Sequence, residues 1–251
     1  MTVELAPQWP DALRRIRERT PARVIAGRAG SSYRTGSQLE LREAHAAAVD
    51  AVHDELELDA TLGAEFCREW KLFEVSTLAS SKAEFLLRPD LGRRFTDEAR
   101  ATVADRCPKN VDVQIAIGDG LSVAAIAAQV PELLPLLASR AREKGWSVGQ
   151  TFVIRHCRVG VMNEISEVLA PKIVVLLIGE RPGLATAESL SAYLGFRPNS
   201  GHTDADRNLI SNIHARGTPP REAATRIIGM ISAMMSQELS GTKLKTPSLQ
   251  P

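Results

Sequence analysis

The sequence predicts an α/β protein with a mostly parallel sheet that is flanked by helices. Three apolar runs, at residues 111–117, 151–155 and 172–178, alternate with segments of helical composition. Strands that alternate with helices imply parallel pairing through right-handed crossovers. Apolar runs that lack a polar face fit a sheet covered on both sides. Together these two observations predict a Rossmann-like layer in the second part of the chain.

The segments that precede this layer are predicted to be helical. Residues 10–19 form an amphipathic pattern that stops at Thr20 and Pro21, and a glycine-marked loop follows at 26–32. Residues 37–58 contain good helix formers and neither Gly nor Pro, which predicts a longer helix. We therefore expect a smaller helical N-terminal domain, residues 1–95, and a Rossmann-like domain, residues 96–251.

The remaining elements of the second domain follow from the same patterns. Helices are expected between the strands, and Pro219 and Gly241 bracket a final helix of about 20 residues. Glu188 to Leu194 is interpreted as a short helix, and Leu209 to Ile213 as a fourth strand. The other predicted helices cover residues 122–144 and 161–169.

Composition narrows the classes of function. The 251 residues include 31 Lys+Arg and 30 Asp+Glu, so the net charge is +1. This balance argues against a nucleic-acid or membrane-surface binder, and no run approaches the ~20 apolar residues that cross a membrane. The start of the chain lacks the apolar core of a secretion signal. Three cysteines without a CxxC pair favour a reducing, cytoplasmic location.

The carboxyl ends of the predicted strands are the expected ligand site of an open α/β sheet. Gly118-Asp119-Gly120 could receive an anion at a helix N-terminus, or Asp119 or Ser122 could simply cap that helix. The turn is not GxGxxG and no Walker lysine follows it. Glu180, after the most apolar strand, could accept hydrogen bonds from a ligand or form an ion pair with Arg181 or a neighbouring Arg.

The histidines do not form a metal site by spacing. His156 and Cys157 are adjacent on a strand and point to opposite faces, so they do not readily share one metal. His45 and His53 lie on a polar helix and are expected to be solvated.

His214 lies in a sequence, Asn212 to Gly217, that is one residue away from Asp-x-His-x-x-Gly. Some proteins use that pattern to place a histidine on the cobalt of B12. Asn212 is neutral and cannot polarise the imidazole as an Asp would, so a structural loop or a partner contact is favoured for His214. No Ser–His–Asp set, paired carboxylates or zinc spacing is present, and the residues alone indicate a binding domain.

Nine ordered motifs, spread over about residues 20–245, resemble the small (light) subunit family of ethanolamine ammonia-lyase, an adenosylcobalamin-dependent enzyme. They are Arg88-Pro89-Asp90-Leu91-Gly92-Arg93-Arg94, Asp112-Val113-Gln114, Asp119-Gly120-Leu121-Ser122, Arg158-Val159, Gly179-Glu180-Arg181-Pro182-Gly183-Leu184, Glu188-Ser189-Leu190-Ser191, Ala205-Asp206-Arg207, Ile210-Ser211-Asn212-Ile213-His214 and Gly217-Thr218-Pro219-Pro220.

This resemblance implies a division of labour between two subunits. The large subunit binds ethanolamine and hosts the chemistry, and the small subunit helps hold adenosylcobalamin at the subunit interface. The complex converts ethanolamine to acetaldehyde and ammonia by radical rearrangement, with the hard chemistry carried by the cofactor. The family keeps the cofactor's own base on cobalt, which also disfavours His214 as a ligand.

The resemblance further implies three cofactor contacts, at Val159, Glu180 and Leu209. Leu209 stands where the family often has Cys, so a backbone contact would survive there and a thiol-specific contact would not. Some family members carry a longer N-terminal extension that targets them to a bacterial microcompartment. The segment Met1 to Thr20 is short, so encapsulation is left open.

Two other functions stay as alternatives to the resemblance. One is a nucleotide-binding oxidoreductase, suggested by the α/β pattern and the glycine turn, although the absent GxGxxG weighs against it. The other is a scaffolding subunit that binds a partner without any ligand.

Overall fold

A computed structural model describes residues 10–19 and 27–245 of the chain. Within these residues, six strands form one sheet in the order β3-β5-β4-β6-β7-β8. The first four of that order pair in parallel, whereas β7 is antiparallel to both of its neighbours. The α/β class and the mostly parallel sheet are therefore confirmed. The strands are β3 (Glu74–Ser76), β4 (Val113–Gly118), β5 (Phe152–Arg155), β6 (Ile173–Gly179), β7 (Leu190–Phe196) and β8 (Asn208–Ile213).

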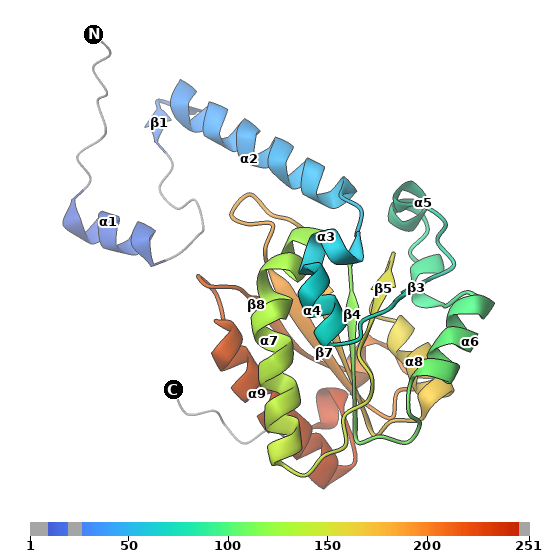
Figure 1. The fold of residues 1–251 in the computed structure, drawn as a ribbon. Coiled ribbons are helices and arrows are strands. Elements are labelled where there is room, and N and C mark those ends of the chain that lie inside the picture. Colours follow the sequence, from blue (N-terminus) through green and yellow to red (C-terminus); the bar gives the residue numbers. More distant parts are fainter. Residues whose placement is uncertain (1–9, 20–26, 246–251) are drawn as a thin grey trace.

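Helices cover both faces of the sheet (Figure 1), as the apolar runs predict. The two core clusters divide β4 by alternation: Ile115 and Ile117 belong to one cluster and Ala116 to the other. The first face is covered by α3 (Leu58–Leu62), α4 (Ala64–Glu69), α7 (Val123–Glu143) and α9 (Pro220–Gln237). The second is covered by α6 (Asp97–Arg106) and α8 (Val161–Leu169). Shorter pieces are α5 (Lys82–Leu87), η1 (Leu91–Arg93), η2 (Asp204–Asp206) and η3 (Gly241–Lys243).

Helix α7 is the longest in the described residues. Its length and its mean hydropathy of 1.2 over 18 residues would allow it to cross a membrane. Among the described residues, α7 is the one helix that meets both conditions. Half of that window is buried, and α7 packs on α9, α3 and β6. These contacts are those of a core helix, which passes the same test of length and composition.

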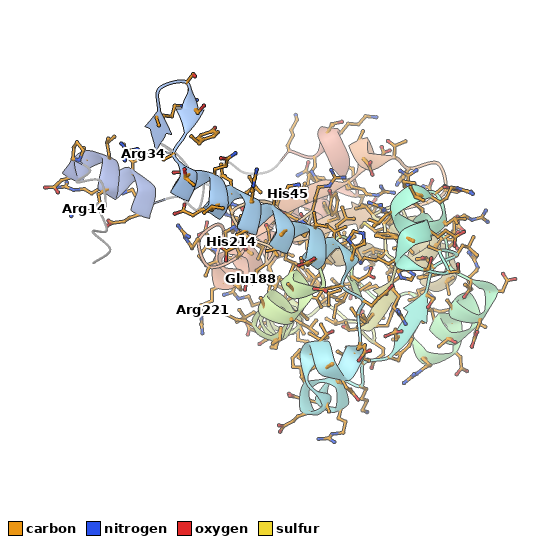
Figure 2. The ribbon with its side chains drawn as sticks, turned by 90° about the horizontal axis from the view of Figure 1, so that it is seen from above. Arg14, Arg34, His45, Glu188, His214 and Arg221 are labelled. Carbon is orange, nitrogen blue, oxygen red and sulfur yellow. The ribbon has the colours of Figure 1, made fainter. Side chains whose placement is uncertain are left out.

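The N-terminal residues form helices but show no core of their own where they are described. The elements of this region are α1 (Asp11–Glu18), a hairpin of β1 (Arg28–Ala29) and β2 (Ser32–Tyr33), and α2 (Thr35–His53). Ala51 is the one buried residue of α2. Figure 2 shows α2 crossing one edge of the body. The stop predicted at Thr20 and Pro21 lies outside the described residues. Strand β3, from the region predicted as helical, pairs with β5.

One predicted element is wrong. Residues 188–194 were expected to be a short helix, and residues 190–196 are strand β7. Leu190, Ala192 and Leu194 belong to one core cluster and Tyr193 packs against the other, which is the two-residue period of a strand. Seven residues of β7 pair with β6, and this pairing decides the conformation of a short segment whose apolar spacing also fits a helix.

Candidate functional site

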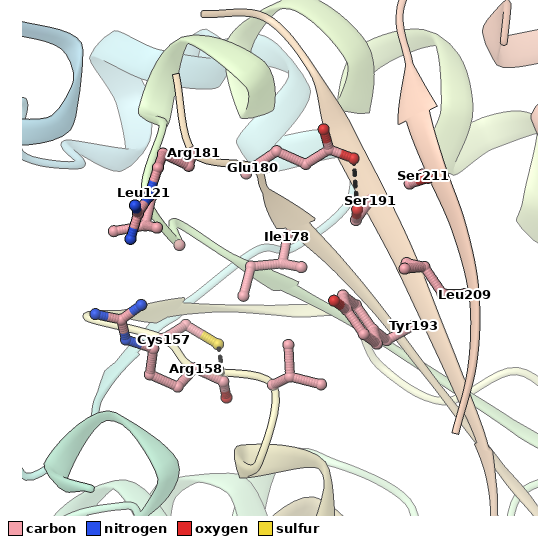
Figure 3. Close-up of a pocket in the computed structure, with 13 residues that line it drawn as sticks. Leu121, Cys157, Arg158, Ile178, Glu180, Arg181, Ser191, Tyr193, Leu209 and Ser211 are labelled. Carbon is pink, nitrogen blue, oxygen red and sulfur yellow. Dashed lines mark hydrogen bonds between the residues drawn. The ribbon is translucent and has the colours of Figure 1, made fainter. Parts of the chain in front are cut away.

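A cavity of about 410 Å³ opens beside the carboxyl ends of β4, β5 and β6. Val159, Glu180 and Leu209, the three residues singled out in the sequence, all line it, together with residues of the turn after β4 and of strands β7 and β8 (Figure 3). Other lining residues are Gly120, Leu121, Cys157, Arg158, Ile178, Gly179, Arg181, Ser191, Tyr193 and Ser211. Segments that are far apart in the chain thus meet at one site.

Leu209 reaches this cavity from the face of the sheet rather than from a strand end. It pairs with Tyr193 on β7, which in turn pairs with Leu176 in the interior of β6. Leu209 is 44% exposed, whereas the next residue along β8, Ile210, is buried on the opposite face. The antiparallel strands thus extend the sheet and leave one of their faces open as the floor of the cavity.

Glu180 is held in place by three hydrogen bonds from its own chain. The hydroxyls of Ser189 and Ser191 each donate to the carboxylate at 2.6 Å, and the backbone N–H of Asn212 donates at 2.8 Å. An ionised carboxylate has about four acceptor positions, so one remains for a ligand. The ion pair with Arg181, considered from the sequence, is not formed in the described structure. Glu180 is therefore a fixed acceptor in the wall of the cavity.

The glycine turn after β4 packs tightly against the end of β6. Gly120 has a φ of +57°, and a Cβ there would lie 2.3 Å from the carbonyl oxygen of Gly179. Ser122 caps α7 by accepting the N–H of Ala125, and its hydroxyl donates to the carbonyl of Ala187 at 2.5 Å. The capping interpretation is confirmed for Ser122 and not for Asp119.

Asp119 is fully buried behind the cavity and does not line it. Its two oxygens accept the backbone N–H groups of His156 and Cys157, each at 2.8 Å. Burial raises the pKa of Asp119, and the Lys82 ammonium at 4.0 Å opposes that rise. Asp119 therefore fixes the loop after β5, which carries Arg158 and Val159 into the cavity.

The opposite side of the cavity from Tyr193 and Leu209 carries two guanidinium groups, those of Arg158 and Arg181 (Figure 3). Arg158 lies over the Phe85 ring, 4.1 Å from its centroid, and donates from Nη2 to the Phe85 carbonyl. Its Nε is buried and has no acceptor within the described residues. Beside it, burial raises the pKa of the Cys157 thiol well above the usual value, so this thiol stays neutral.

The histidines occupy structural positions. His156 has one ring nitrogen 2.9 Å from the carbonyl of Ala79 and the other 3.2 Å from Glu55. His45 and His53 are exposed on α2, as predicted. In the part of the chain that the structure describes, no three His, Cys, Asp or Glu side chains gather as a metal site.

His214 uses both ring nitrogens within its own loop. Nδ1 accepts the backbone N–H of Arg216 at 3.2 Å, so Nε2 carries the proton and donates to Asn212 Oδ1 at 2.8 Å. The ring is buried. Neither nitrogen is left for a metal, which supports the structural role favoured from the sequence.

Comparison with known proteins places the chain in a family. Residues 10–245 match the model of the ethanolamine ammonia-lyase light chain, EutC. This chain belongs to that family. It is 41% identical over 239 residues to the ethanolamine ammonia-lyase small subunit of Clostridium perfringens, covering 95% of this chain and 79% of that protein. The small subunit of Clostridium acetobutylicum is 36% identical over 235 residues, covering 94% and 95%.

Family membership makes this chain a subunit of a carbon–nitrogen lyase. The small-subunit name of its relatives implies a large subunit as partner. It also explains why no catalytic set could be named from this chain alone.

Sequence reasoning missed the residues in and just before β7 that support the site. Ser189, which precedes β7, and Ser191 and Tyr193, which lie on it, were placed on a helix, where they would not share one face. Their two-residue spacing puts them on one side of a strand, but a segment this short does not separate a strand from a helix by pattern alone. The unpartnered Nε of Arg158 was also not anticipated, because it depends on the path of the distant residues 85–92.

Proposed function

We propose that this chain is the small subunit of an adenosylcobalamin-dependent ethanolamine ammonia-lyase, and that its strand-end cavity helps bind the cofactor at the interface with the large subunit. The observation that carries this proposal is the meeting of Val159, Glu180 and Leu209 in one cavity, from three separate segments. The first two follow strands, and the third lies on an open sheet face.

The residues of the cavity fit the chemistry of this cofactor. A corrin is rimmed with amides and its nucleotide carries a ribose, and both offer donors to the remaining acceptor position of Glu180. Val159, Ile178 and Leu209 provide apolar contact for ring surfaces. Arg158 and Arg181 also line the cavity, and their guanidinium groups would donate to the cofactor's phosphate or amide oxygens. We therefore place the cofactor's contacts with this chain here.

The surface around the cavity supports a partner on its open side. A second groove, between α2 and residues 181–184, shares Leu121 and Arg181 with the cavity. Val49 and Leu184 line this groove and are each 43% exposed. Contiguous exposed apolar side chains are typical of interaction sites. We propose that the large subunit covers this groove and closes the cavity. A hollow of about 410 Å³ on one chain is too small to enclose so large a cofactor by itself.

When bound, adenosylcobalamin supplies the radical chemistry that converts ethanolamine to acetaldehyde and ammonia. This chain's residues hold and orient the cofactor and keep water from one side of it. The proposed setting is the cytoplasm, supported by three cysteines that are all unpaired and buried, and encapsulation stays open.

Reconstitution tests the proposal. The purified chain alone should lack ammonia-lyase activity, and mixing it with a cognate large subunit and adenosylcobalamin should give activity. Val159→Asp, which brings a charge to the apolar wall, should weaken the cofactor's affinity by about tenfold or more while leaving the KM for ethanolamine unchanged. Glu188→Ala, an exposed change outside the cavity lining, is the control. Full turnover by this chain alone would overturn the assignment.

A further inference from the structure

The cation side of the cavity consists of Arg158 and Arg181. Among residues 10–19 and 27–245, neither guanidinium forms an ion pair. The nearby carboxylates are already occupied, because Asp119 faces Lys82 and Glu180 accepts from two serines and a backbone N–H. The positive charge at this end of the cavity is therefore available to a ligand.

A third guanidinium, that of Arg93, adds to this charge. Burial lowers the pKa of Arg158, and the charges of Arg181 and Arg93 lower it further. An anion bound beside Arg158 would offset the repulsion that these two cations exert on it.

Two glycines fix where the arginines lie. A Cβ on Gly92 would lie 2.7 Å from Cγ of Arg158, and a Cβ on Gly160 would lie 2.8 Å from Cγ of Arg93. The segment with Gly92 and Arg93 and the segment with Arg158 and Gly160 thus lie against each other. The glycine of each makes room for the aliphatic part of the other's arginine side chain. The N–H of Arg158 also donates to the carbonyl of Gly92 at 2.8 Å. The guanidinium of Arg158 is therefore placed by backbone contacts rather than left free on the surface.

We infer that Arg158 and Arg181 form an anion subsite that binds the phosphodiester of the cofactor's nucleotide tail. Phosphate is the anion that guanidinium groups bind best, through charge-assisted and often bidentate hydrogen bonds. Arg158 and Arg181 both line the cavity, so their guanidinium groups can supply N–H donors to a phosphate there. This inference rests on the proposed function, because it assigns one end of the proposed cofactor site to one part of the cofactor.

The experiment compares two ligands that differ in the nucleotide tail. Cyanocobalamin carries the phosphodiester, and dicyanocobinamide has the same corrin without the tail. Both are titrated by absorbance and calorimetry into the assembled complex of large and small subunits, with wild-type chain, Arg158→Gln or Arg181→Gln. Arg142→Gln, on the last turn of α7 and outside the cavity lining, is the matched control. Inorganic phosphate is a separate competitor.

Each arginine variant is expected to weaken cyanocobalamin binding by about 10- to 100-fold, the range of one lost charge-assisted interaction. Dicyanocobinamide binding should stay within about twofold of wild type, because this ligand lacks the tail that the arginines contact. Comparing both ligands in both proteins isolates the contacts to the tail. The salt dependence of cyanocobalamin binding should also be shallower in the variants. Phosphate should compete with cyanocobalamin and not with dicyanocobinamide.

Other results would overturn the inference in distinguishable ways. Equal weakening of both ligands would show that the arginines contact the corrin or shape the cavity instead. No weakening of either would remove them from the site while leaving the proposed function intact. A wild-type complex that binds neither ligand would overturn the proposed function itself. Competition by phosphate against both ligands would assign the subsite to a free anion rather than to the tail.

Discussion

Asp119 follows β4 and Glu180 follows β6, each directly after a glycine at the same edge of the sheet. Asp119 is fully buried and accepts two backbone N–H groups of the β5 loop. Glu180 is half-buried and faces the cavity, with Ser189 and Ser191, just before and on β7, as donors. The difference comes from sheet order: β4 lies between two parallel strands, whereas β6 borders the antiparallel extension. Two similar sequence patterns therefore have different roles: Asp119 supports a loop from inside the protein, and Glu180 faces the cavity.

The largest effect is expected for Asp119→Asn. An amide leaves the Lys82 ammonium buried without a counter-charge and turns one acceptor into a donor that faces a backbone N–H. We expect a loss of about 3–5 kcal/mol in the free energy of unfolding, measured by urea denaturation. Lys82→Met in the same chain should recover part of that loss. If Asp119→Asn left stability unchanged, the support role would be wrong.

Glu180→Ala is expected to have a smaller effect on stability and a larger one on binding. Two of its three donors are hydroxyls that can turn to other acceptors, so we expect a loss of about 2 kcal/mol in unfolding free energy. Cobalamin affinity of the assembled complex should fall by about tenfold, while the KM for ethanolamine is unchanged. Glu180→Gln keeps the shape of the side chain and one acceptor oxygen, so its cobalamin affinity should lie between those of wild type and Glu180→Ala. An unchanged cobalamin titration in both variants would remove Glu180 from the site.

Asp112, at the other end of β4, extends the comparison to a carboxylate near the surface. Lys172, and then the N–H of Ser147, lower the pKa of Asp112. Its stabilising contribution is therefore complete above the unfolded pKa of about 3.9 and disappears as the pH falls through the lower folded value. Asp112→Asn should cost about 0.5–1 kcal/mol at pH 7. The melting temperatures of variant and wild type should converge near pH 2, and a constant gap would contradict this account.

Leu209→Cys should have the smallest effect. The side chain is 44% exposed, so stability should change by less than about 0.5 kcal/mol. Cys keeps an apolar surface on the cavity floor, and cobalamin affinity should stay within about threefold of wild type. Leu209→Asp is the contrasting variant and should weaken binding clearly. A large loss with Cys would show that the leucine shape itself matters.

Much of the sheet could be predicted from the sequence because its central strands are continuous apolar runs. Residues 172–178 and 111–117 correspond to β6 and β4 within one or two residues. Strand β7 was missed because a seven-residue segment carries too little periodicity to separate a strand from a helix. Strand β3 is three residues long, and its conformation depends on pairing with β5, which no local pattern reports.

The site was predictable only to the extent that it follows strand ends. Val159 and Glu180 come after strands, so the general rule for open α/β sheets identifies them. Leu209 lies within β8, on a face left open by the antiparallel extension, and only the family resemblance indicated it. The burial of Asp119 and the orphaned Nε of Arg158 depend on packing between distant segments.

The reciprocal glycines have a consequence for how this family varies. Gly92 makes room for Arg158, and Gly160 makes room for Arg93, so each arginine and the opposing glycine form one unit across two segments. The three atoms nearest to a Cβ on Gly160 all belong to the Arg93 side chain, whereas a Cβ on Gly92 would also lie 2.8 Å from the backbone carbonyl oxygen of His156. A lineage that replaces Arg93 by a smaller residue is therefore released from the need for glycine at 160, but glycine at 92 stays required whatever stands at 158. An alignment should show positions 93 and 160 as two correlated columns.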